Sequence, residues 1–164
     1  MSSKKFIKSR NEMEKILREE RVGFLGLSAN GMPYVIPLNY GYIEGKILFH
    51  CAIKGQKLDW IRTNPQVCFT VGRQSGELCR HPYGAHCPID TDSVICYGTA
   101  RIIEDKKERW KILNIFNRRL QPDAEEIPIE EISNCLAVEI KITEMTGRQQ
   151  RKGIEWTYFE YNFE

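Results

Sequence analysis

The dipeptide Asn30-Gly31 separates two runs of residues that are typical of β-strands, 22–28 and 32–42. Asparagine and glycine tolerate the positive φ that a tight two-residue turn requires, so the sequence predicts an antiparallel hairpin here. Pro33 and Pro37 lie inside the second run. Because proline has no N–H to donate to a ladder, this strand is expected at an edge, or bulged, or facing something other than a neighbouring strand.

The remaining chain alternates β-rich runs with helical patterns. The run 134–143 has apolar side chains at every second position, as in a strand with one buried face. Further strands are predicted at 47–51, 66–72 and 93–103, and helices at 10–20, 55–63 and 105–120, the last with Trp110, Leu113 and Phe116 or Leu120 turned inward. Closure removes exposed sheet edges, so this order predicts a mainly β (α+β) fold, a closed or nearly closed antiparallel barrel with short helices at its ends.

The length, charge and N-terminal sequence of the chain indicate how many domains, which partners and which cell compartment to expect. A chain of 164 residues with 41% hydrophobic content is long enough for one domain, expected over 1–164 with a C-terminal arm at 149–164. The net charge of +2 comes from acidic and basic residues that are mixed throughout, so neither nucleic acid nor a membrane is expected as a partner. The start of the chain lacks the apolar region of a secretory signal, which predicts a soluble cytoplasmic protein with reduced cysteines.

The segment 48–65 combines residues that suit a phosphate group. A strand end carries Phe49, His50 and Cys51, a loop follows with Lys54 and Gly55, and Lys57 stands in the first turn of a helix. Free backbone amides at a helix N-terminus, with lysines and a glycine that allows close approach, form a phosphate site. The alternative from spacing alone is a solvated basic loop that caps an ordinary helix.

This segment resembles the flavin-phosphate segment of the pyridoxamine-phosphate-oxidase-like split barrels, and in particular the nitroimidazole-resistance (Nim-type) subgroup. The matching pieces are Phe49-His50 and Gly55-Gln56-Lys57-Leu58-Asp59. The upstream run 30–40 is similar to the subgroup's Gly-x-Pro-x-x-x-Pro-x-x-Tyr strand. The similarity continues through 93–105 and ends near Gly147, so it covers most of the chain.

The resemblance implies a homodimer of FMN-binding split β-barrels, with the cofactor sites at the interface. It implies contacts to the flavin ring from Pro37, Leu38 and Asn39, contacts near the strand end from Phe49, His50 and Cys51, and a phosphate site at Lys54, Gly55, Gln56 and Lys57. Many of the oxidases have an arginine where this chain has Gln56, so the phosphate charge would rest on Lys57 with Lys54 or a partner residue. No match to the substrate-phosphate motif of the true oxidases is found, and pyridoxamine phosphate is not expected as substrate.

Three other features have a functional and a structural interpretation. His50 is the candidate for a group that touches flavin and substrate, or else a hydrogen-bonded strand-end histidine without chemistry. Trp156, in the aromatic tail, either stacks near FMN or packs in the core. Cys79, His81, His86 and Cys87 form either a zinc site or a loop between two strands, polar and at the surface or lying over the flavin. The adjacency of His86 and Cys87 argues against chelation by both.

The function that these features predict is an FMN-dependent oxidoreductase acting on a small electrophile such as a 5-nitroimidazole. Flavin supplies the redox chemistry itself, so the absence of an obvious nucleophile or carboxylate pair is compatible with an enzyme. The alternatives are a non-enzymatic flavin- or haem-binding protein of the same barrel and a zinc-stabilised binding module.

Overall fold

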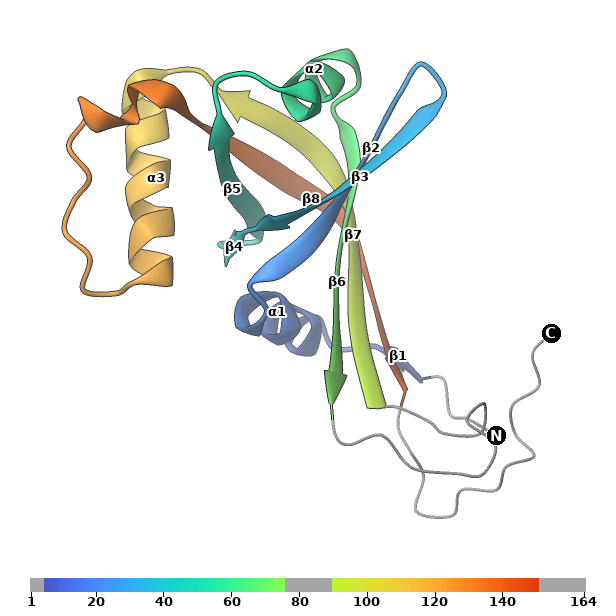
Figure 1. The fold of residues 1–164 in the computed structure, drawn as a ribbon. Helices are drawn as coiled ribbons and strands as arrows, with labels where there is room; N and C mark the ends of the chain where they lie inside the picture. The colour runs from blue at the N-terminus through green and yellow to red at the C-terminus, as the bar shows by residue number, and fades with distance from the viewer. Residues whose placement is uncertain (1–4, 76–89, 151–164) are drawn as a thin grey trace, which may run out of the picture.

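A computed structural model describes residues 5–75 and 90–150. Within them one eight-stranded antiparallel sheet has the order β3-β2-β6-β7-β8-β5-β4, with β1 added on β8 (Figure 1). The strands are β1 (Lys5–Ile7), β2 (Val22–Ala29), β3 (Met32–Asn39), β4 (Gly41–Ile43), β5 (Lys46–Ala52), β6 (Gln66–Ser75), β7 (Asp90–Ile103) and β8 (Cys135–Gln150). The helices are α1 (Arg10–Glu19), α2 (Gln56–Thr63), α3 (Lys106–Leu120) and the short 3-10 helix η2 (Glu131–Asn134).

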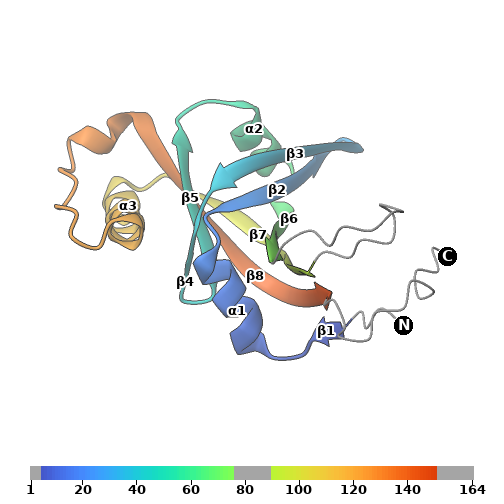
Figure 2. The same ribbon diagram turned by 60° about the horizontal axis from the view of Figure 1, so that its bottom comes forward.

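The sheet curls into a barrel that is not closed, because β3 and the β4–β5 hairpin are the two ends of the strand order (Figure 2). This confirms the predicted split barrel. β3 pairs only with β2 among the described strands, so its prolines occupy an edge strand as expected, and the hairpin turns at Asn30 (φ 52°) and Gly31 (φ 78°). The predicted strand 32–42 is two strands, since the buried Tyr40 belongs to neither and β4 pairs with β5 instead of β2.

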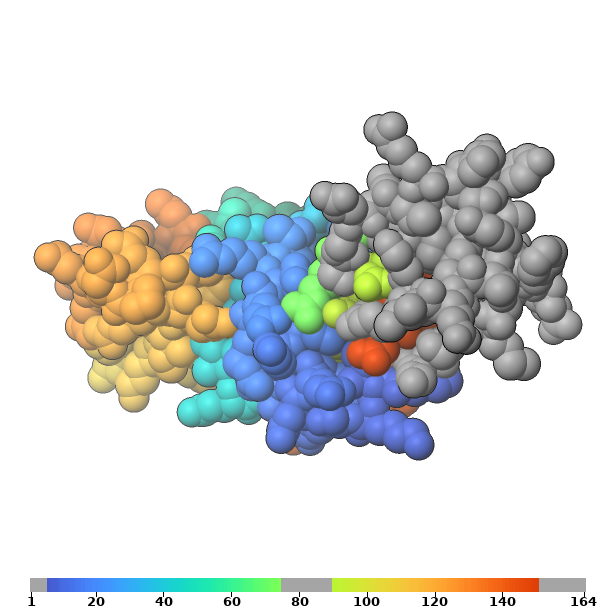
Figure 3. All heavy atoms as spheres, turned by 90° about the horizontal axis from the view of Figure 1, so that it is seen from below, coloured from blue at the N-terminus to red at the C-terminus, as the bar shows by residue number. Residues whose placement is uncertain are grey.

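Apolar side chains from alternate strand positions fill the barrel. The main core includes Leu25, Phe69 and Ile140, each 0% exposed. Helices α1 and α2 close opposite ends of the barrel, and Leu17 and Leu58 extend this core from them (Figure 1). Figure 3 shows α1 across the lower end, with α3 beside it.

Helix α3 packs on the outside of the barrel and forms a second, smaller core with the outer face of the sheet. Its members are Ile103, Leu113, Ile132 and Ala137, with Trp110 packed against them. Asn114 is 4% exposed and fastens the following loop, because its side chain donates to the Trp110 carbonyl (3.1 Å) and accepts from the Ile127 N–H (2.8 Å). Of the helix residues expected to face inward, Leu120 is 37% exposed.

Candidate functional site

The N-terminus of α2 is open to solvent. Gly55 caps the helix with φ 147° and ψ 156°, a conformation that only glycine adopts readily, and no side chain bonds to the cap. A Cβ placed on Gly55 would meet nothing within 4 Å. The Leu58 amide donates to the Gly55 carbonyl (2.9 Å), whereas the amides of Gln56 and Lys57 precede the first hydrogen bond of the helix, so this glycine leaves room for an anion to approach those two.

Two lysines flank this N-terminus. Lys54 is exposed and Lys57 is half-buried, and within the described segments neither forms an ion pair with a carboxylate. The acidic residue of the first turn, Asp59, lies 3.5 Å from Arg62 instead. Burial raises the pKa of the Cys51 thiol, and the nearby Lys57 ammonium opposes that rise, which places the lysine close to the end of β5. The described part of the site therefore offers two cations without carboxylate partners beside free amide groups.

Strand β5 delivers its predicted site residues to opposite faces. Phe49 (2% exposed) and Cys51 (8% exposed) point into the barrel core, whereas His50 is exposed on the outer face. This split follows from the two-residue period of a strand. His50 packs edge-on against Phe116 of α3, with ring centroids 5.2 Å apart.

The β3 residues expected to contact a cofactor lie on the edge strand. Pro37 and Asn39 are exposed and Leu38 packs against the core. Helix α2 contacts this edge strand through Trp60, whose ring is tilted against Tyr34 with a centroid separation of 5.2 Å. Pro37 therefore lies on the edge strand β3 and Lys57 in the first turn of α2, and the contact between these two elements is made by Tyr34 and Trp60.

A cavity of about 290 Å³ lies beneath α3, beside His50. Its walls come from α3, the loop that follows, η2 and the first residue of β8, and they include Phe116, Glu131 and Cys135. Cys135 pairs with Ala52 across the sheet, which puts its thiol on the same outer face as His50. Burial raises the pKa of Cys135, so the thiol is protonated at neutral pH.

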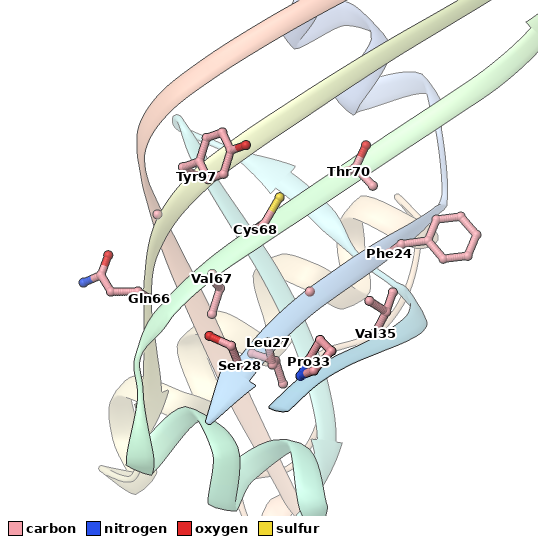
Figure 4. Close-up of a pocket in the computed structure, with 12 residues that line it drawn as sticks. Phe24, Leu27, Ser28, Pro33, Val35, Gln66, Val67, Cys68, Thr70 and Tyr97 are labelled. Atoms are coloured by element: carbon pink, nitrogen blue, oxygen red, sulfur yellow. The ribbon is translucent and has the colours of Figure 1, made fainter. Parts of the chain in front are cut away.

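A second hollow, of about 500 Å³, lies on the outer face of β2, β3, β6 and β7 (Figure 4). Its apolar rim is formed by Phe24 (45% exposed), Val35 (63%) and Tyr97 (47%). Cys68 and Thr70 line the floor between them. Large exposed apolar side chains gathered on one face of a sheet are typical of an interaction surface.

Some predicted site residues lie outside the described residues, namely Trp156 and the cluster Cys79, His81, His86 and Cys87. Within residues 5–75 and 90–150, no group of three or more metal-ligating side chains is found. In the same part of the chain, no helix has the length and apolarity to cross a membrane.

Residues 9–149 match the model of a known family, the pyridoxamine 5'-phosphate oxidases. The chain belongs to the pyridoxamine 5'-phosphate oxidase family. A stretch of 65 residues is 29% identical to an uncharacterized protein of Rhizobium meliloti. This stretch makes up 40% of this chain and 42% of the Rhizobium protein. The chain thus spans less than half the length of this curated relative.

Solved structures of the same fold cover nearly the whole chain. A candidate 5-nitroimidazole antibiotic resistance protein from Bacteroides thetaiotaomicron is 25% identical, with a TM-score of 0.78 over 92% of this chain and 89% of that one. The flavocytochrome Anf3 from Azotobacter vinelandii is 20% identical, with a TM-score of 0.76 over 90% of this chain and 70% of that one. An FAD-binding protein from Mesorhizobium loti is 22% identical, with a TM-score of 0.67 over 90% and 98% of the two chains. The latter two likenesses concern the fold alone.

No pattern in the sequence predicts the cavity beneath α3. Cys135 and Glu131 come more than 80 positions after His50, and only the pairing of β5 with β8 places them beside it. The helical pattern that turned Phe116 inward was the one usable signal, because it shows which face of α3 covers the sheet. Strand β1 was not predicted either, because a run of three residues is too short to show the two-residue period of a strand.

Proposed function

We propose that this chain binds FMN with its phosphate at the N-terminus of α2. The observation that carries the proposal is the open glycine cap at Gly55, flanked by Lys54 and Lys57 without carboxylate partners in the described segments. A phosphate monoester dianion matches free amides and two ammonium groups better than the diester phosphates of FAD do. Membership of the family and the flavin-binding proteins of the same fold point the same way.

The chain's own residues would hold and orient the cofactor. The edge strand β3 has main-chain groups that pair with no second strand of the described sheet, and those at Pro37, Leu38 and Asn39 are assigned to the rim of the flavin ring. Lys57 balances the phosphate charge from a half-buried position, and Lys54 adds a solvent-screened contribution. FMN supplies hydride and electron transfer when it is bound.

The functional unit in this proposal is a homodimer. The apolar rim formed by Phe24, Val35 and Tyr97 belongs to an outer face of the sheet next to the β3 edge. A second copy of the chain would cover these side chains and bring its own residues to the same edge strand. Both cofactor sites would then lie at the interface.

The reaction proposed is reduction of a small electrophile, with a 5-nitroimidazole as the candidate compound. The support for this compound is the resemblance at 25% identity to the Bacteroides protein. His50 is assigned to the substrate, because its exposed imidazole can donate a hydrogen bond to a bound compound.

The activity is tested by anaerobic reoxidation of the reduced holoprotein. Protein loaded with FMN is reduced with dithionite and mixed with 2-methyl-5-nitroimidazole, and the return of flavin absorbance is followed. The proposal predicts faster reoxidation than for free reduced FMN at the same concentration, and a slower rate in His50→Gln. Equal rates for bound and free FMN would refute the reductase and leave a flavin-binding protein without this activity.

A haem-binding function is the alternative to an FMN reductase. Its support is that solved structures of this fold include a flavocytochrome and an FAD- and haem-binding protein from Mycobacterium smegmatis. Haem needs an axial ligand, and His50 is the single histidine within residues 5–75 and 90–150. A haem absorption band that disappears in His50→Gln would favour this function over the reductase.

A further inference from the structure

Acidic and basic residues are mixed along most of the chain, but in α3 and the segment after it they are separated by sign. Residues 106–119 contain six lysines and arginines and one acidic residue, Glu108. Residues 121–139 contain six acidic residues and no lysine or arginine. The whole chain has 24 basic and 22 acidic residues, so this separation is a local feature.

The outward side of α3 carries a basic stripe around one apolar side chain. Its four exposed members follow one another at spacings of four and three positions and so share one face of the helix, namely Lys107, Lys111, Ile115 and Arg118. Ile115 is 47% exposed in the middle of this stripe. Glu108 does not cancel the stripe, because its carboxylate lies 2.6 Å from the Arg101 guanidinium of β7.

An acidic stripe lies beside the basic one. The loop that follows α3 runs along the helix on the side away from the barrel (Figures 1 and 2). It is fastened to α3 by the Asn117 amide, which donates to the Glu125 carbonyl at 3.1 Å. The loop and the start of η2 expose five carboxylates, those of Asp123, Glu125, Glu126, Glu130 and Glu131.

The two stripes neutralise each other little within the chain. In the part of the chain that the structure describes, one ion pair joins them, between Arg118 and Glu126 at 3.5 Å, and both side chains are more than half exposed. Such an exposed pair contributes little to stability. Lys107 and Lys111 form no ion pair with a residue of the segments 5–75 and 90–150. The face therefore keeps charges of both signs that a partner can meet.

The arrangement of signs selects the kind of partner. A nucleic acid or an anionic membrane would be attracted by the basic stripe and repelled by the acidic stripe next to it. A second copy of the chain, turned by a two-fold axis, brings its acidic stripe onto the basic one and its basic stripe onto the acidic one. Both contacts are then attractive, so the face is complementary to itself.

We propose that the face formed by the basic stripe of α3 and the acidic stripe of residues 123–131 binds the same face of a second copy of this chain. Ile115 gives the contact an apolar centre, and the charges around it set the orientation of the two copies. This face is separate from the apolar rim at Phe24, Val35 and Tyr97, which belongs to β2, β3 and β7. Neither FMN nor the homodimer of the proposed function is needed for it.

The association is tested by sedimentation velocity of the full-length protein over a range of protein concentrations, in about 0.05 M and about 0.5 M NaCl. The proposal predicts that the sedimenting mass doubles with rising concentration at low salt, and that high salt weakens this step at least about tenfold. The doubling leads from two copies to four where the homodimer of the proposed function forms, and from one copy to two where it does not. The result is therefore independent of the flavin proposal.

Exchange of the charges identifies the face. The double variants Lys107→Glu with Lys111→Glu, and Asp123→Lys with Glu125→Lys, each make both stripes of one sign, so each variant alone should fail to double its mass. An equimolar mixture of the two variants should double again, because each stripe then meets its opposite. The control is Lys8→Glu with Arg148→Glu, two exposed positions in or beside the β1–β8 pair, which changes the net charge as the first variant does and should associate like the unmodified chain.

Three results would overturn the proposal. The unmodified protein could show no doubling at low salt, a variant with both stripes of one sign could still double alone, or the mixture could fail to recover the step. Loss of the step in the Lys8 and Arg148 control would overturn it as well, since net charge and not this face would then govern association.

Discussion

Gly55→Ala tests the geometry of the α2 N-terminus. Gly55 has φ 147°, a region that costs an L-residue about 1–3 kcal/mol, while a Cβ there would touch nothing within 4 Å. The cost is therefore backbone strain without a clash, and the free energy of unfolding should fall by about 1–3 kcal/mol. For a domain of this size that corresponds to a melting temperature lower by about 2–4 °C per kcal/mol.

The same methyl group would occupy the space assigned to the phosphate, so Gly55→Ala should also weaken FMN binding by at least about tenfold, or 1.4 kcal/mol. The matched control is Gly31→Ala. Gly31 also has a positive φ (78°) and open space where a Cβ would lie, but it stands in the hairpin turn. It should lose a comparable amount of stability and keep its FMN affinity.

Both quantities are measured on the same samples, stability by urea unfolding and affinity by quenching of flavin fluorescence. If Gly55→Ala and Gly31→Ala bound FMN equally well, the assignment of the phosphate to this helix N-terminus would be refuted. If Gly55→Ala lost no stability, the expected backbone strain at this position would be wrong as well.

Three further substitutions test the dimer face, the loop anchor and the surroundings of Cys51. Phe24→Glu puts a charge on the apolar rim and should convert a dimer to a monomer in analytical ultracentrifugation, whereas a dimer that persists would exclude this face. Asn114→Ala leaves the partly buried Ile127 N–H without its side-chain acceptor and should cost about 1–3 kcal/mol in urea unfolding; no loss would show that the loop needs no such anchor. Lys57→Ala removes the cation that lowers the Cys51 pKa, so less thiolate forms at a given pH and alkylation of Cys51 should slow at pH 8, as measured by mass spectrometry; an unchanged rate would place Lys57 elsewhere.

Much of the fold could be predicted because local chemistry and tertiary structure agree. The hairpin at Asn30-Gly31, the cap of α1 by Ser9 and the edge position of β3 each follow from one residue type whose backbone needs are specific. The interruption between β3 and β4 at Tyr40 was not predicted, because Tyr40 makes a tertiary contact: its hydroxyl donates to the Leu17 carbonyl at 2.8 Å.

The candidate site was predictable only where its residues are close in sequence. The segment from Phe49 to Lys57 is contiguous, so its strand, loop and helix could be placed from pattern alone. The opposite orientations of His50 and Cys51 also follow from strand periodicity, although which face lies outside depends on the whole barrel. The cavity beneath α3 depends on strand register and on the loop held by Asn114, which no local pattern encodes.

The assignment of a flavin phosphate to the α2 N-terminus can be tested by a fluorescence titration of the full-length protein with FMN, comparing the unmodified chain with Lys57→Ala and with Lys111→Ala, an exposed lysine on α3. Loss of a charge-assisted hydrogen bond costs about 1.5–3 kcal/mol, so Lys57→Ala should weaken binding by about 10- to 150-fold, while Lys111→Ala should match the unmodified protein. Binding of FMN that is equally tight in all three proteins, or absent from the unmodified one, would contradict the claim that the N-terminus of α2 holds a flavin phosphate.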